Sequence, residues 1–172
     1  IQMKLLKKKK INSKRIMLVP FKDGDVTNEY VEWMNNENIT QYILKANQKF
    51  NKKKLSQFVK DLDNSNCDIF YRILLKDSNS HIGNIRLGPI NFKQRYSKFG
   101  ILIGNVNYHR KGYAKEAIEM IIKFCFEELN LKLFQFECVC NNVAAMNLYK
   151  SMGFNMQNTS EKFVKNKKTL DQ

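Results

Sequence analysis

The stretch YHRKGYAKEAI, residues 108–118, joins the end of one predicted strand to the start of the most regular helix in the chain. From 112 to 129, apolar side chains recur every three or four positions, which predicts one buried helix face. Gly112 lets the backbone approach a ligand closely, and the first amides of a helix have no intrahelical acceptor. With Arg110 and Lys111 beside them, these amides are typical of an anion site that suits a diphosphate, although a plain exposed loop has the same composition.

Strand and helix patterns alternate on both sides of this turn. The predicted elements, in chain order, are a strand (13–20), two helices (23–35 and 51–62), three strands of an antiparallel meander (68–76, 81–89 and 96–104), a helix (112–129), a strand (131–140), a helix (142–152) and a short strand from 154. Asp23 or Asp25 is the expected cap of the first helix, and Asn51 caps the second. Residues 165–172 are polar and predict no closing strand. This order predicts an α+β domain.

The net charge is +14, from 30 Lys and Arg against 16 Asp and Glu, and it is unevenly distributed. Seven basic and no acidic side chains lie in the first 15 residues. We therefore expect residues 1–12 to form a flexible basic arm, with Ile1 and Gln2 resembling the remnant of an expression tag, and residues 13–172 to form one domain. Such an arm could bind nucleic acid or an anionic membrane, or it could be a solvated tail.

Several protein classes are disfavoured by what the sequence lacks. No apolar run approaches the roughly 20 residues of a membrane span, and no apolar stretch follows the basic residues as in a secretion signal. The four cysteines lack zinc or disulfide spacing and there are two histidines, so we expect reduced thiols, no metal and a cytoplasmic protein. The signatures of serine hydrolases, P-loop proteins and dinucleotide-binding folds are missing.

Two motifs resemble those of the GCN5-related N-acetyltransferase (GNAT) superfamily. The family pattern [QR]-x-x-G-x-[GA] at a strand-to-helix turn is matched by Gly112 and Ala114, with His109 at the Gln or Arg position. The second pattern, N-x-x-A-x-x-x-Y-x-x-x-G-F, is complete as Asn142, Ala145, Tyr149, Gly153 and Phe154. The resemblance covers about residues 13–163, and members that modify ribosomal proteins or amino sugars are the most similar.

The resemblance implies a mixed, mostly antiparallel sheet with helices on both faces and a V-shaped split between the fourth and fifth strands. Acetyl-CoA would bind in this split as a co-substrate, without a metal. His109 departs from the family residue, which mainly supports the loop through polar contacts. The residues expected to bind the coenzyme are Ile101, Leu102 and Ile103 through their backbone, the turn His109, Arg110, Lys111, Gly112, Tyr113 and Ala114, and Asn142.

The same resemblance gives two residues chemical roles. An ammonium acceptor must lose a proton before it attacks, and Glu137 stands where a base is proposed in ribosomal alanine acetyltransferases of the family. Glu137 is equally well an ordinary carboxylate on a solvated strand face. Tyr149 occupies the family's position for the acid that protonates the leaving CoA thiolate, and its alternative is a core tyrosine that packs with Leu148 and Met152.

The expected acceptor is a primary amine on a small molecule, first of all a nucleotide-linked amino sugar of a surface-polysaccharide pathway. Trp33, His81 and Asn84 are weak acceptor-site candidates, since an aromatic residue at the position of Trp33 is more often part of the core and His81 is equally a strand-end residue. A protein N-terminus is the alternative acceptor, and a nucleic-acid- or ribosome-binding module that uses the basic arm is an alternative of another class. We expect a bacterial monomer or homodimer with no membrane or nucleic-acid partner.

Overall fold

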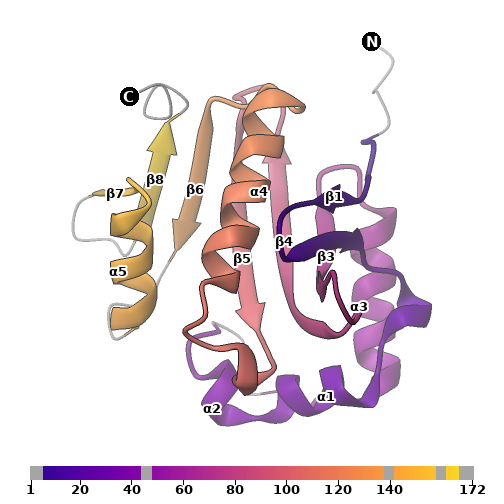
Figure 1. Ribbon diagram of the computed structural model, residues 1–172. Helices are drawn as coiled ribbons and strands as arrows, with labels where there is room; N and C mark the ends of the chain where they lie inside the picture. Colours follow the sequence, from indigo (N-terminus) through magenta and orange to yellow (C-terminus); the bar gives the residue numbers. More distant parts are fainter. Residues whose placement is uncertain (1–5, 44–47, 138–141, 158–161, 167–172) are drawn as a thin grey trace.

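The computed structural model describes residues 6–43, 48–137, 142–157 and 162–166, and its elements follow the predicted alternation of strands and helices (Figure 1). The strands are β1 (Ile11–Asn12), β2 (Ile16–Pro20), β3 (Ile69–Leu75), β4 (His81–Asn91), β5 (Tyr96–Ile103), β6 (Leu133–Glu137), β7 (Asn155–Gln157) and β8 (Lys162–Asn166). The helices are α1 (Asn28–Asn35), α2 (Glu37–Thr40), α3 (Lys52–Asn64), α4 (Tyr113–Glu127) and α5 (Val143–Ser151), with 3-10 turns η1 (Asp23–Asp25) and η2 (Val106–Tyr108). None of the helices in these ranges is long and apolar enough to cross a membrane.

All eight described strands form one sheet, in the order β1-β2-β3-β4-β5-β6-β8-β7. Neighbouring strands are antiparallel except β5 and β6, which run parallel. Their pairing ends at Phe99 and Phe136, so residues 100–103 of β5 pair only with β4 within the described chain. The predicted mixed sheet is confirmed, and within the described chain the β5–β6 pairing ends where the split between the fourth and fifth predicted strands was expected.

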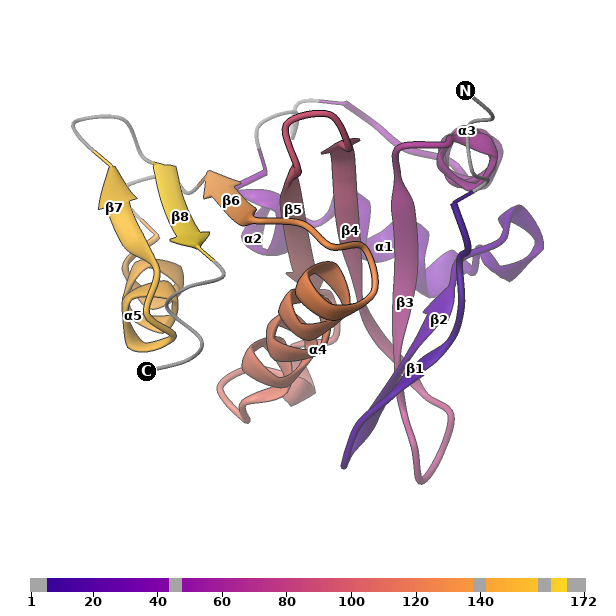
Figure 2. The same cartoon turned by 90° about the horizontal axis from the view of Figure 1, so that it is seen from above.

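Alternate side chains of the sheet build two hydrophobic clusters, one on each face. On β3, Ile69, Tyr71 and Ile73 belong to the cluster under α4, whereas Phe70 packs with buried residues of α1 and α3. Seen from above, α4 and α5 lie on one side of the sheet and α3 lies on the other (Figure 2). Helices therefore cover both faces, as predicted.

Residues 6–12 pack against the domain instead of forming the flexible arm expected over 1–12. Leu6 is buried in the cluster under α4, and β1 pairs with β2. Nζ of Lys8 donates to two carbonyl oxygens at the end of α3, 2.8 and 2.5 Å away. Nζ of Lys9 binds a carboxylate just past the end of α4, at 2.6 Å. Cations at helix carboxyl ends satisfy free carbonyls and favour the helix dipole, which explains why this basic segment is held.

Three local predictions differ from the structure. The helix expected over 23–35 begins only after Thr27, whose side chain caps α1, while Asp23 and Asp25 form the 3-10 turn before it. Helix α2 lies outside every predicted element, and strand β8 includes residues 165 and 166, where no strand was expected because their side chains are polar. Strand β8 pairs with both β6 and β7 and so completes the sheet. The cap expected at Asn51 is confirmed.

Candidate active site

Helix α4 begins without a capping side chain. Its N-cap residue, Gly112, lies in the left-handed region at φ 82° and ψ 6°, and no side chain in the described part of the chain caps the helix. Arg110, two residues earlier, also has a positive φ of 58°. Left-handed residues beside bare helix amides form concave loops that attract anions. This turn therefore has the geometry that a diphosphate site requires.

His109 ties this turn to the sheet. Its Nε2 donates to the carbonyl oxygen of Ile103, the last residue of β5, at 2.6 Å. The imidazole thus supports the loop through a polar contact, which is the role of the residue at this position in the quoted motif. Nζ of Lys111 lies 5.7 Å from the centre of the Tyr108 ring, so its positive charge stays beside the turn.

The turn of the β1–β2 hairpin, residues 13–15, lies against the first turn of α4. The hydroxyl of Ser13 and the amide of Arg15 donate to Oε1 of Glu116, and Nε of Arg15 donates to Oε2 at 2.7 Å. Burial alone would raise the pKa of Glu116, but these donors outweigh it and hold the pKa below its usual value. Sequence analysis missed these contacts, because the residues lie 101 or more positions apart and no motif links them.

Beyond its pairing with β6, strand β5 has an edge that no described strand covers. Ile101, Leu102 and Ile103 pair with β4 along one edge, and the described part of β6 leaves their other edge unpaired. All three residues are partly buried. Free amides and carbonyls on a strand edge are ready partners for an extended chain, which is the arrangement needed for the expected pantetheine contact.

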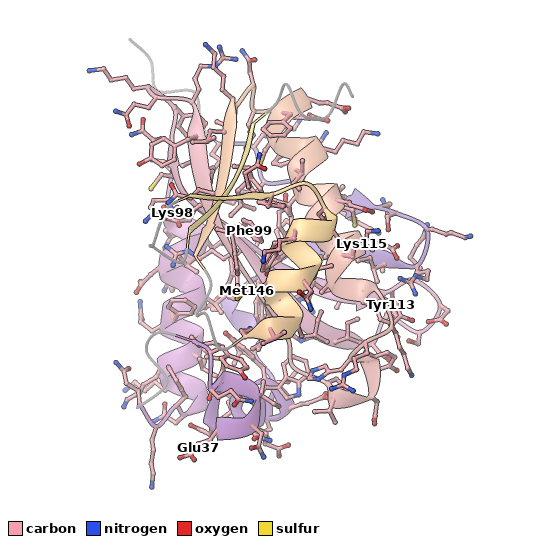
Figure 3. The ribbon with its side chains drawn as sticks, turned by 90° about the vertical axis from the view of Figure 1, so that its left-hand side faces the viewer. Glu37, Lys98, Phe99, Tyr113, Lys115 and Met146 are labelled. Atoms are coloured by element: carbon pink, nitrogen blue, oxygen red, sulfur yellow. The ribbon has the colours of Figure 1, made fainter. Side chains whose placement is uncertain are left out.

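The ring of Tyr149 lies where β5 and β6 part. Its centre is 4.0 Å from that of Phe136 and 6.0 Å from that of Phe99, the last register pair of the two strands. The residue is only 2% exposed. In the view from the side of α5, Phe99 lies on one side of that helix and Tyr113 of α4 on the other (Figure 3). Tyr149 is thus a buried aromatic, as its alternative interpretation requires, and it stands at the split, as the acid role requires.

Asn142 and Glu137 flank the connection from β6 to α5. Oδ1 of Asn142 accepts from the amide of Ala145 at 3.2 Å and caps α5. Glu137 is the last residue of β6, one position beyond the last residue that pairs with β5. The backbone of Glu137 is therefore placed beside the split, while its side chain lies outside the described residues.

The three acceptor-site candidates lie together on the face covered by α1. Trp33 is 5% exposed, its ring centre is 5.1 Å from that of His81, and a Cβ at Gly104 would lie 2.1 Å from the indole. Nε2 of His81 donates to Oδ1 of Asn84 at 2.7 Å. Burial lowers the pKa of His81 below its ordinary value, since it disfavours the imidazolium. Trp33 thus packs as a core aromatic, and His81 is held neutral beside it.

Two donors on this face are buried without a hydrogen-bond partner in the described structure, Nδ2 of Asn84 and Nε of Arg72. The two residues are cross-strand partners on β4 and β3, and Arg72 also pairs with Asp25 at 3.2 Å. Orphaned buried donors are places where water or a ligand group can bind. This face of the sheet therefore contains polar groups that the sequence identified only in part, because Arg72 lies inside an otherwise apolar strand.

The described residues contain no group of three His, Cys, Asp or Glu placed to hold a metal ion. Cys67 and Cys125 are free thiols, whereas Cys138 and Cys140 lie outside the described residues. The described residues therefore provide an uncapped helix start for an anion, a strand edge for an extended chain, and a buried phenol beside the last described β5–β6 pair.

Comparisons with known proteins agree with this geometry. A sequence model of the acetyltransferase (GNAT) domain matches residues 15–155. An uncharacterized N-acetyltransferase of Bacillus subtilis, YnaD, is 27% identical over 157 residues, which cover 90% of this chain and 87% of that protein. An acetyltransferase of the GNAT family from Bacillus anthracis matches with a TM-score of 0.74 at 19% identity, over 93% of this chain and 99% of that one. Spermidine N-acetyltransferase from Vibrio cholerae, solved with CoA and spermine, matches with a TM-score of 0.74 at 22% identity, over 87% and 91%.

Proposed function

Because the chain belongs to the GNAT acetyltransferase family and is an acyltransferase, we propose that it moves an acetyl group from acetyl-CoA to the primary amine of a small molecule. The observation that carries the proposal is the uncapped start of α4 beside the split between β5 and β6. A helix start without a side-chain cap offers its amides to a diphosphate, and the rest of the coenzyme then extends into the split.

In this proposal the chain holds acetyl-CoA mainly through its backbone. The amides of residues 110–114 bind the diphosphate, with Lys111 adding charge. The edge of residues 101–103 pairs with the pantetheine arm and aims a donor at the thioester oxygen, where negative charge develops during attack. Asn142 lies next to the same arm, at the start of α5.

The chemistry needs one proton acceptor and one proton donor. Glu137 takes the proton from the acceptor ammonium, and the neutral nitrogen forms a bond to the acetyl carbon. The C–S bond then breaks, and the phenol of Tyr149 gives its proton to the departing thiolate. The nitrogen loses its second proton as the amide forms, and this proton restores the phenol of Tyr149. The position of Tyr149 beside the last β5–β6 pair supports this role, since the thioester would lie in the split.

The proposal is tested by the release of free CoA thiol from acetyl-CoA in the presence of amino-sugar nucleotides, peptides and polyamines. We expect release with at least one class of amine, and the class identifies the acceptor. A protein that neither binds CoA nor releases thiol with any of them would contradict the proposal. In Glu137→Gln the loss of turnover should be largest at low pH, where few amines are already neutral, and a pH-independent loss would exclude Glu137 as the base.

The acceptor that we propose first is a nucleotide-linked amino sugar, whose phosphates suit the overall positive charge of +14. A second candidate, a polyamine, is favoured by one local observation. Residues 23–40, which include α1 and α2, contain no Lys or Arg, and Glu29, Glu32 and Glu37 are exposed there. This segment attracts cations, and the amine panel separates the two candidates. Peptide substrates in the same panel test the alternative of a protein N-terminus.

The alternative of a nucleic-acid- or ribosome-binding module has less support from the structure. It depends on the basic residues at the start of the chain, and two of them are engaged within the domain. Lys8 binds carbonyl oxygens of α3, and Lys9 binds Glu128. Binding of RNA with an association constant that falls steeply as the salt concentration rises would support this alternative.

A further inference from the structure

The β1–β2 turn, which lies outside both sequence motifs, contacts the turn before α4. We call this turn, residues 109–112, the coenzyme loop, because the diphosphate is expected to bind there. Nη1 of Arg15 donates to the carbonyl oxygen of Lys111 at 2.9 Å, and Cζ lies 4.2 Å from the centre of the Tyr113 ring. A Cβ built on Gly112 would lie 3.3 Å from Nη2 of Arg15. The guanidinium therefore lies across the turn that precedes α4, on the residues expected to hold the diphosphate.

The bond to Lys111 sets the direction of a neighbouring amide. In a trans peptide unit the C=O and N–H bonds point in opposite directions, and the peptide that joins Lys111 to Gly112 is trans. With the carbonyl held toward Arg15, the amide of Gly112 points away from the hairpin. His109 holds the other end of the turn through its bond to the end of β5. Side chains from two different parts of the chain thus fix the loop from both ends.

Arg15 also controls a carboxylate in the first turn of α4. A first-turn carboxylate is attracted to free amides at a helix start, where it would compete with a bound diphosphate and repel it. Ser13 and Arg15 instead engage both carboxylate oxygens of Glu116, whose side chain is only 15% exposed. The hairpin turn therefore neutralises the carboxylate of Glu116 in the first turn of α4.

We propose that Arg15 is a positioning residue for coenzyme binding: it holds the carbonyl of Lys111 and, with Ser13, the carboxylate of Glu116, so that the amides of residues 112–114 stay available. This inference rests on the proposed function, because it needs CoA to bind at this turn. It requires no direct contact between Arg15 and the coenzyme.

The experiment measures CoA binding by calorimetry in the full-length wild type, Arg15→Ala, Glu116→Ala and the double variant. We expect Kd to rise about tenfold in Arg15→Ala, equivalent to about 1.4 kcal/mol, and to change less than about twofold in Glu116→Ala. The double variant should recover to within about threefold of the wild type, since the competing carboxylate is gone. In turnover assays Arg15→Ala should raise KM for acetyl-CoA and leave kcat unchanged.

A matched control is Arg95→Ala, because Nε of Arg95 also donates to a backbone carbonyl oxygen, that of Asn130, at 2.7 Å and away from the coenzyme loop. This variant should bind CoA like the wild type. Arg15→Lys keeps the charge but loses the planar fork, so it should bind with intermediate affinity, and it replaces Arg15→Ala if that variant does not fold.

Three results would overturn the inference: unchanged CoA affinity in Arg15→Ala, no recovery in the double variant, or a loss that disappears when dephospho-CoA replaces CoA. The last result would mean that Arg15 binds the 3′-phosphate directly. A wild-type protein that does not bind CoA would overturn the proposed function as well. Normal binding by the wild type together with an unaffected Arg15→Ala would overturn only the role of Arg15.

Discussion

Helices α4 and α5 follow the two parallel strands β5 and β6, yet they begin in opposite ways. The side chain of Asn142 caps α5, whereas Gly112 leaves α4 uncapped. A side-chain cap contributes about 1 kcal/mol. The 15-residue α4, with eight buried side chains, retains its packing without a cap, but the 9-residue α5 buries fully only Tyr149 among its described residues. The long, well-packed α4 is stable with an uncapped start, which is then free to bind a ligand. The short α5 depends on its cap, and the group that it is expected to provide is a side chain, Tyr149, rather than its backbone amides.

The largest expected effect comes from a substitution that obstructs the uncapped start of α4. In Gly112→Glu, a side chain at φ 82° is strained, approaches Arg15 and adds a negative charge. We expect CoA affinity to fall about 100-fold or more, since each bond to a charged group is worth about 1.5–3 kcal/mol. Calorimetry measures the loss. Gly24→Ala is the control, because nothing lies within 4 Å of its Cβ position. Tight CoA binding by Gly112→Glu would show that the diphosphate does not bind at the start of α4.

The matching change in α5 should affect chemistry and leave binding intact. In Tyr149→Phe the ring still packs on Phe136, but the phenolic proton is lost. We expect kcat to fall about 100-fold, in the range of a general acid, with an unchanged Kd for CoA. Steady-state kinetics and calorimetry together separate the two quantities. Tyr96→Phe, at the far end of β5, should be neutral. Full turnover by Tyr149→Phe would leave the residue with a packing role only.

Two of the helix starts that an asparagine caps, those of α3 and α5, can be compared directly. Asn51→Ala and Asn142→Ala each remove a cap, so each should lower the free energy of unfolding by about 1 kcal/mol, as measured by urea denaturation. Only Asn142→Ala should also raise KM for acetyl-CoA, because α5 begins beside the split. If both variants had the same KM, the contact of Asn142 with the pantetheine arm would be excluded.

The smallest expected effect concerns the opposite face of the sheet. Burial lowers the pKa of His81, so the folded protein resists its protonation. Below the ordinary histidine pKa of about 6.5, the unfolded chain takes up a proton that the folded chain does not, and stability is lost as the pH falls to the folded pKa. We expect His81→Gln to reduce the drop in urea midpoint between pH 7.5 and pH 5.5. An equal drop in both proteins would show that other groups cause it.

Local patterns predicted most of the fold. The spacing of apolar residues located α3, α4 and the meander, and Asn51 and Gly112 marked helix starts, because periodicity and backbone freedom are properties of neighbouring residues. The motif residues His109 and Gly112 could likewise be identified as one turn. Contacts between distant segments could not be predicted. The bonds from Arg15 to Glu116 and from Lys8 to the end of α3 join residues that are far apart in the sequence. Strand β8 likewise pairs with β6, from which α5 and β7 separate it in the sequence.

The contacts of Lys8 and Lys9 imply that deleting the start of the chain would destabilise the domain. A truncation designed from the amino-acid composition alone would remove residues 1–12 as a flexible basic arm. That cut would remove β1 and uncover the carboxyl ends of α3 and α4, which lie on opposite faces of the sheet. It would also remove the strand that pairs with β2 and so loosen the segment that holds Arg15 against Lys111. We therefore expect the shortened protein to have a lower melting temperature and a slower turnover, because it would lose the segment that connects α3 on one face of the sheet with α4 on the other.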